Sequence, residues 1–153
     1  MNKTAITQWF NNHREEILND YYTLLKFPTI GADPTHIKDC DACAAWIVAF
    51  LEKLGFTAEI VRKNEHAPAL VIAERLVDDA LRTVLVYGHY DVQPVDPLDL
   101  WETPPFIPTE RNGRIYARGA QDDKGQWFSL LQGLRAAIEA GEKLPSIRIV
   151  LEG

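Results

Sequence analysis

The 153-residue chain lacks several features that mark particular classes of protein. It has no apolar run of the roughly 20 residues needed to cross a bilayer. No signal-peptide core follows the N-terminus, so we expect a cytoplasmic protein. Two cysteines do not make a disulfide framework. Lys and Arg total 16 against 22 Asp and Glu, without a basic stripe, which argues against nucleic acid or a membrane surface as a partner.

Two catalytic motifs are also missing, a Gly-rich phosphate loop and a G-x-S-x-G elbow, which weakens a nucleotide-binding interpretation. Cys40 and Cys43 have the spacing of redox and zinc sites, but no second pair accompanies them and no strand precedes them. We interpret them as structural residues. His13, His36 and His66 have no liganding neighbours in sequence, and we interpret them as surface residues.

The sequence does contain alternating helical and strand patterns over the length of one domain. This alternation predicts an α/β fold, a three-layer sandwich with a mostly parallel mixed sheet and helices on both faces. The apolar run at 82–88 predicts a central strand covered on both faces. We expect helices at 4–26, 37–54 and 124–140, strands at 56–62, 69–74, 82–88 and 147–151, a turn at 78–79, an irregular loop at 94–108 and a hairpin at 107–116.

A His-x-Asp pattern ends the most apolar strand. His89 and Asp91 are two residues apart, so their side chains leave the same face. Ligands collect at the carboxyl ends of strands in open α/β sheets. Neutral imidazole is a common metal ligand, and a neighbouring carboxylate can fix its tautomer, so Asp91 is a better partner for His89 than a ligand itself. A polar strand end with a turn aspartate is the alternative.

An acidic pair, Asp122 and Asp123, stands where a helix begins. Aspartate at a helix start satisfies free backbone N–H groups and the helix dipole, and taken alone this pattern favours capping. Two adjacent carboxylates repel each other unless a positive charge is near. A divalent cation is one source of that charge, and Lys124 or Arg118 is another.

In combination, these stretches resemble the M20 metallopeptidases, and most closely their dipeptidase and carnosinase-like branch. The resemblance rests on YGHYDVQP at 87–94, on Trp101, Pro105-Phe106 and Gly113, and on YARGAQDDKG at 116–125. It implies a hydrolase with two metal ions, usually zinc, with manganese or cobalt as alternatives. It further implies that His89 binds one metal, that Asp91 supports His89, that Asp122 bridges both metals, and that a cis peptide joins Asp122 to Asp123.

The implied reaction is hydrolysis of dipeptides or short peptides by a water activated between the two metals. The family's general base lies in a Glu-Gly-x-Glu-Glu motif, and Glu152-Gly153 match its first two letters. We therefore expect residues 1–153 to be the N-terminal portion of an M20-type catalytic domain, without the rest of that domain or the lid and dimerisation domain. Alone, these residues are expected to be inactive and to bind zinc weakly, while the full-length form is a candidate homodimer acting on a peptide or small amide.

Two alternatives stay open at this point. One is an N-acyl amino acid deacylase or a desuccinylase, which shares the metal motif. The other is a non-catalytic fragment or binding module that keeps only the fold.

Overall fold

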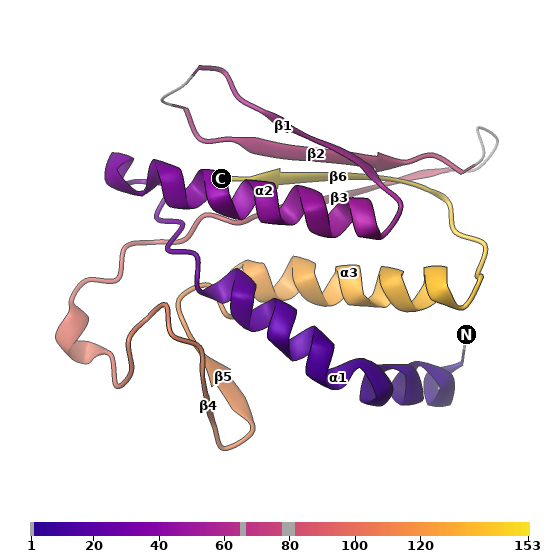
Figure 1. The fold of residues 1–153 in the computed structure, drawn as a ribbon, viewed down its shortest axis with the longest axis horizontal. Helices are drawn as coiled ribbons and strands as arrows, with labels where there is room; N and C mark the ends of the chain where they lie inside the picture. Colours follow the sequence, from indigo (N-terminus) through magenta and orange to yellow (C-terminus); the bar gives the residue numbers. More distant parts are fainter. Residues whose placement is uncertain (1, 65–66, 78–81) are drawn as a thin grey trace.

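The order of helices and strands follows the expected one. The structure, a computed structural model, describes residues 2–64, 67–77 and 82–153 (Figure 1). Helix and sheet-strand boundaries lie within one residue of those predicted, while the turn at 78–79 and His66 fall outside the described residues. The elements are α1 (Lys3–Leu25), η1 (Pro34–His36), α2 (Ile37–Lys53), β1 (Thr57–Val61), β2 (Leu70–Arg75), β3 (Thr83–His89), η2 (Leu98–Leu100), β4 (Thr109–Arg111), β5 (Arg114–Tyr116), α3 (Lys124–Glu139) and β6 (Ser146–Glu152).

Four strands form one mixed sheet in the order β1-β2-β6-β3. This sheet and its helices confirm the α/β class. The prediction of a mostly parallel sheet is wrong for these strands, because β1/β2 and β2/β6 are antiparallel and only β3/β6 is parallel. The connections explain the difference. Only residues 62–69 separate β1 from β2 in sequence, whereas β3 reaches β6 through the long crossover that contains α3.

The helices of the described residues lie on one side of the sheet, with α2 and α3 against it and α1 packed on α3 (Figure 1). Side chains on that face, such as Ile149 and Leu151, are fully buried. On the other face Leu85 is 66% exposed and Tyr87 63% exposed. The predictions of helices on both faces and of a central, buried β3 are therefore corrected for this part of the chain. Among the described strands, β3 lies at the edge of the sheet. The prediction failed because an apolar run indicates that both faces of a strand are apolar, but not what covers them.

The segment between β3 and α3 combines an irregular loop with a hairpin, as expected. The loop contains η2 and a cis bond before Pro97, and the indole of Trp101 donates to the carbonyl of Val95 at 2.9 Å. In the hairpin β4/β5, Asn112 and Gly113 have φ values of 52° and 71°, the left-handed conformation required of a two-residue turn. None of the helices in the described ranges is long and apolar enough to cross a membrane.

The isolated histidines and the cysteine pair take structural positions. His13 Nδ1 lies 2.8 Å from the carbonyl of Trp9, and His36 Nδ1 lies 2.7 Å from a carboxylate oxygen of Asp39; both histidines are half-buried and not fully on the surface. Cys40 and Cys43 are free thiols buried in the core against the sheet. Burial raises the pKa of Cys40 to about 11 and that of Cys43 to about 12, which keeps both thiols protonated and unreactive.

The buried thiols should make stability fall above pH 9. Each folded pKa lies above the ordinary value of 9.0, so the unfolded chain loses these protons first and stability present below pH 9 is lost as the pH rises. From pH 8 to 10 the loss is up to about 1.4 kcal/mol per thiol. Urea unfolding at pH 8 and at pH 10 measures this loss. The free energy of unfolding should decline by roughly 2–3 kcal/mol less in the double variant Cys40→Ala/Cys43→Ala than in the wild type. An equal decline in both proteins would contradict the burial of these thiols.

Candidate active site

Two segments distant in sequence meet at the carboxyl end of β3. His89 is the last residue of β3, and Asp122 and Asp123 directly precede α3, which packs beneath that strand. Between them lies a polar cavity of about 380 Å³ that His89, Asp91, Arg118 and Asp122 help to line. The sequence therefore predicted correctly that the His-x-Asp pattern and the acidic pair come together.

The imidazole of His89 stands between two carboxylates. Its Nδ1 lies 2.9 Å from Asp91 Oδ1, and its Nε2 lies 3.2 Å from Asp122 Oδ1. Burial lowers the pKa of His89, but the contacts with Asp91 and the charge of Asp123 outweigh it and leave the pKa above its ordinary value. If Nδ1 carries the proton and donates it to Asp91, Nε2 of a neutral ring has a lone pair, and this lone pair would face the carboxylate of Asp122. The geometry thus favours either a ring proton or a cation at Nε2.

The main chain of His89 is also held from both sides. Its N–H donates to Asp123 Oδ2 at 3.2 Å, and its carbonyl accepts from the indole of Trp127 at 3.1 Å. Asp123 is the N-cap residue of α3 but makes no side-chain capping bond. The capping interpretation therefore fails for Asp123, whose carboxylate binds the end of β3. The peptide bond between Asp122 and Asp123 is cis, as the M20 resemblance implied.

The two basic residues near the acidic pair are engaged elsewhere. The ammonium of Lys124 is fully buried and donates to the carbonyls of Leu24 at 3.2 Å and Phe27 at 2.9 Å. Burial lowers its pKa to about 8. Arg118 donates to a backbone carbonyl at 3.0 Å, and its guanidinium lies over an indole ring. In the described part of the chain neither residue forms an ion pair with Asp122. The positive charge beside Asp122 is therefore supplied either by a proton on the ring of His89 or by a bound cation.

Residues that the sequence did not single out support the turn after β3. The hydroxyl of Thr29 donates to the carbonyl of Tyr90 at 2.6 Å, and the carbonyl of Thr29 accepts from Val92 N–H at 2.7 Å. The hydroxyl of Tyr90, itself fully buried, donates to Ala69 at 2.7 Å. These bonds fix the segment that carries Asp91. Thr29 follows a proline in a loop, and no pattern in the sequence connects it to residues 60 positions later.

The donors present fit part of a metal site. Two ligands bound at about 2.0–2.2 Å in tetrahedral geometry lie about 3.3 Å apart, close to the separation of His89 Nε2 and Asp122 Oδ1. Imidazole nitrogen and carboxylate oxygen are both ligands that zinc accepts. Among the described residues there is no group of three or more His, Cys, Asp or Glu placed to hold a metal ion. The pair therefore makes one edge of a site and not a complete one.

Comparisons with known proteins agree with this geometry. The family model for peptidase family M20/M25/M40 matches residues 85–153, which begin in β3 and include His89 and Asp122. A cysteinylglycine-S-conjugate dipeptidase of Corynebacterium striatum is 33% identical over 99% of this chain and 33% of its own length. The family-model match places residues 85–153 in family M20. A succinyl-diaminopimelate desuccinylase of Nitrosospira multiformis is 34% identical over 80% of the chain and 31% of its own length.

Solved structures extend the M20 likeness to the fold. The crystal structure of human carnosine dipeptidase 1 has a TM-score of 0.88 at 26% identity, covering 98% of this chain and 34% of that one. The chain spans about a third of the length of the curated relatives it matches. Its relatives are hydrolases, and the fold that carries His89 and Asp122 here is the one seen in human carnosine dipeptidase 1.

The close approach of Asp123 to Gly88 gives a test of the clamp on β3. A Cβ at Gly88 would lie 2.8 Å from Asp123 Oδ2 and 3.2 Å from carbons of Leu151 and Trp127. We expect Gly88→Ala to lower the free energy of unfolding by about 1–3 kcal/mol through overpacking. The matched control is Gly133→Ala in α3, where a Cβ meets nothing within 4 Å. It should raise stability by about 0.5–1 kcal/mol. Urea unfolding that ranks the two variants equally would contradict the clamp.

Proposed function

We propose that residues 1–153 supply part of the catalytic site of a metal-dependent dipeptidase. The observation that carries this proposal is the imidazole of His89 between the carboxylates of Asp91 and Asp122, in a polar cavity at the carboxyl end of β3. The match of residues 85–153 to a family of hydrolases supports it. The substrates that we propose are dipeptides or short peptides, the class named for the Corynebacterium striatum relative.

Each residue of the site has a distinct proposed role. His89 Nε2 and Asp122 Oδ1 would hold divalent metal, with zinc as the first choice, manganese or cobalt as alternatives, and two ions in the complete site. When bound, such ions polarise the scissile carbonyl and lower the pKa of a water. Asp91 holds the ring of His89 in the orientation that presents Nε2 to the cavity. Asp123 and Trp127 fix the main chain of the same residue.

We propose that the remaining ligands and the general base come from outside residues 1–153. The described residues supply only a pair of ligands, and the curated relatives are about three times as long. The register of the sheet pairs His89 with Glu152, so the carboxyl end of β6 lies beside the cavity. The complete protein would add the rest of the catalytic domain and a second domain for substrate binding and dimerisation.

A second candidate is removal of a succinyl group from an amino acid, an amide hydrolysis of the same chemical type. The 34% identity to a succinyl-diaminopimelate desuccinylase favours it.

The complete gene product, supplied with zinc, manganese or cobalt, should hydrolyse Cys-Gly or β-Ala-His, or else N-succinyl-diaminopimelate. Replacing Asp91 with Asn should lower kcat/KM about 10–100-fold through loss of the orienting carboxylate. His89→Ala should lower it further. His36→Ala, which removes a histidine paired with Asp39 on another element, should leave kcat/KM unchanged. A gene product that hydrolyses none of these substrates, or a His89→Ala variant with full activity, would contradict the proposal.

Residues 1–153 by themselves should show no turnover and only weak zinc binding. A complete structural zinc site provides about 10–16 kcal/mol, so a two-ligand edge should provide roughly half, a Kd of about a micromolar or weaker. Isothermal titration calorimetry measures this affinity, and His89→Ala should abolish it. Tight one-to-one uptake, or metal-dependent hydrolysis that disappears in His89→Ala, would show that these residues form a working site without further ligands.

A further inference from the structure

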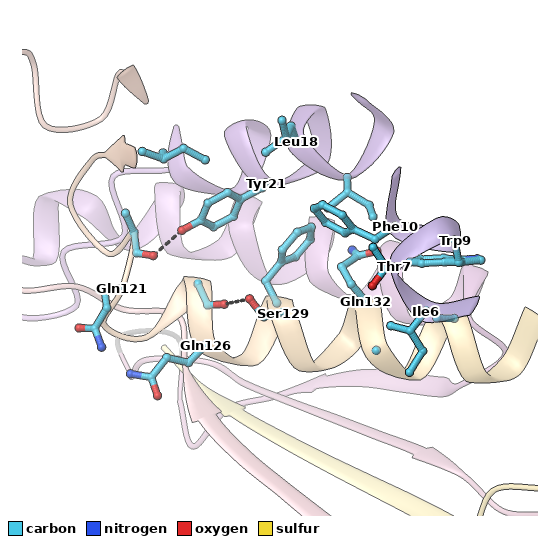
Figure 2. A pocket seen from close by; sticks show the side chains of 17 residues that line it. Ile6, Thr7, Trp9, Phe10, Leu18, Tyr21, Gln121, Gln126, Ser129 and Gln132 are labelled. Atoms are coloured by element: carbon cyan, nitrogen blue, oxygen red, sulfur yellow. Dashed lines mark hydrogen bonds between the residues drawn. The ribbon is translucent and has the colours of Figure 1, made fainter. Parts of the chain in front are cut away.

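A second and larger cavity lies between α1 and α3, away from the imidazole of His89. Its volume is about 740 Å³, within the range of about 300–1,000 Å³ typical of small-molecule sites. Figure 2 shows side chains from the two helices facing each other across it. Aromatic rings make much of its wall, namely those of Trp9, Phe10, Tyr21 and Phe128.

The lining of this α1/α3 cavity carries no formal charge. All of its lining residues belong to the described part of the chain, and none is Asp, Glu, Lys, Arg or His. Burying an unpaired charge in such surroundings is strongly unfavourable. The lining therefore favours an uncharged occupant, unlike the zwitterionic dipeptides proposed for the cavity at His89. The lining residues with polar side-chain atoms are Thr7, Trp9, Tyr21, Gln121, Gln126, Ser129 and Gln132.

Gln132 is the unusual polar residue of this lining. Its side chain is only 6% exposed, and both its Nε2 and its Oε1 are buried without a hydrogen-bond partner. In Figure 2 its amide lies between α3 and α1, close to Thr7 and Phe10. A buried donor or acceptor without a partner costs about 1–3 kcal/mol, and an apolar side chain of similar size at this position would avoid that cost. The amide offers one donor and one acceptor to a ligand.

Polar contacts outside the cavity hold its wall in place. The indole of Trp9 donates to Glu139 at 2.6 Å, and the guanidinium of Arg135 binds Glu139 at 2.8 Å and Glu16 at 2.9 Å. These contacts join α1 to α3 at the end of the cavity that Trp9 lines. A wall held in this way binds a ligand without first having to be ordered.

We propose that the α1/α3 cavity binds a small uncharged molecule with an aromatic body and a primary carboxamide, whose N–H and carbonyl pair with the amide of Gln132. Two amide groups complement each other as donor and acceptor, and the surrounding rings pack against the aromatic body. Ala120 and Gln121 line this cavity and also the cavity at His89. The bound molecule would therefore contact the loop that leads to Asp122, which Tyr21 already contacts through its bond to the carbonyl of Ala120.

Benzamide is the probe that tests this site, with ligand-detected NMR and calorimetry as the measurements. Wild-type protein should bind it with a Kd of about 1 mM or tighter, reasonable for a fragment of this size. Benzoate, of the same shape but charged, and toluene, without the amide, should each bind about tenfold more weakly. No benzamide binding at about 10 mM, or equal binding of all three probes, would overturn the proposal.

Two variants in α3 locate the binding. Gln132→Leu should weaken benzamide about tenfold, leave toluene unchanged and unfold at the same or higher denaturant concentration than wild type. Gly133→Phe places a ring where a Cβ meets nothing within 4 Å, so it should fill the cavity and abolish binding of both probes without disturbing the fold. Unchanged benzamide affinity in either folded variant would place the amide elsewhere.

This proposal is independent of the proposed dipeptidase activity. His89→Ala should leave the affinity for benzamide unchanged while it removes metal-dependent hydrolysis. Loss of benzamide binding in His89→Ala would show that the probe occupies the metal cavity, and would overturn the assignment to the α1/α3 cavity.

Discussion

The position of His89 depends on two hydrogen bonds between side chains at the start of α3 and the main chain at the end of β3. Asp123, the N-cap of α3, accepts from the N–H of His89 and Trp127 donates to its carbonyl, so both main-chain polar groups of this residue are bound by side chains at the start of the same helix. The imidazole is not needed to hold the strand end, and it lies between the carboxylates of Asp91 and Asp122. Two adjacent aspartates thus divide two functions, since Asp123 fixes the strand and Asp122 faces the cavity.

The cavity at His89 and the α1/α3 cavity differ in chemistry although they share a wall. The cavity at His89 is polar and acidic, whereas the α1/α3 cavity is apolar and uncharged apart from a buried amide. Residues 120 and 121 separate them. Residues 120 and 121 therefore face the acidic groups at His89 on one side and aromatic rings on the other. Any change in the packing of α1 on α3 reaches this loop through the bond from Tyr21 to the carbonyl of Ala120.

The boundaries of the elements could be predicted from local patterns in the sequence, whereas the pairing of His89 with Asp122 followed from the M20 resemblance. Apolar spacing and turn residues set the boundaries of α1, α2 and α3, and the motifs around His89 and Asp122 are contiguous. Features that depend on contacts between segments distant in sequence could not be predicted. The exposure of Leu85 and Tyr87 depends on what covers the sheet, and the bond from Trp127 to His89 depends on how α3 turns beneath β3. The unpaired amide of Gln132 looks in sequence like an ordinary polar position of a helix.

Lys124 connects the start of α3 to the end of α1. The buried ammonium binds the carbonyls of Leu24 and Phe27, at the end of α1 where the helix dipole favours a positive charge. This lysine directly follows the acidic pair of the site. Removing residues 1–27 would leave the buried ammonium of Lys124 without both acceptors and would destabilise the first turn of α3. Residues 24–27 thus support the start of α3, which directly follows Asp122 and Asp123.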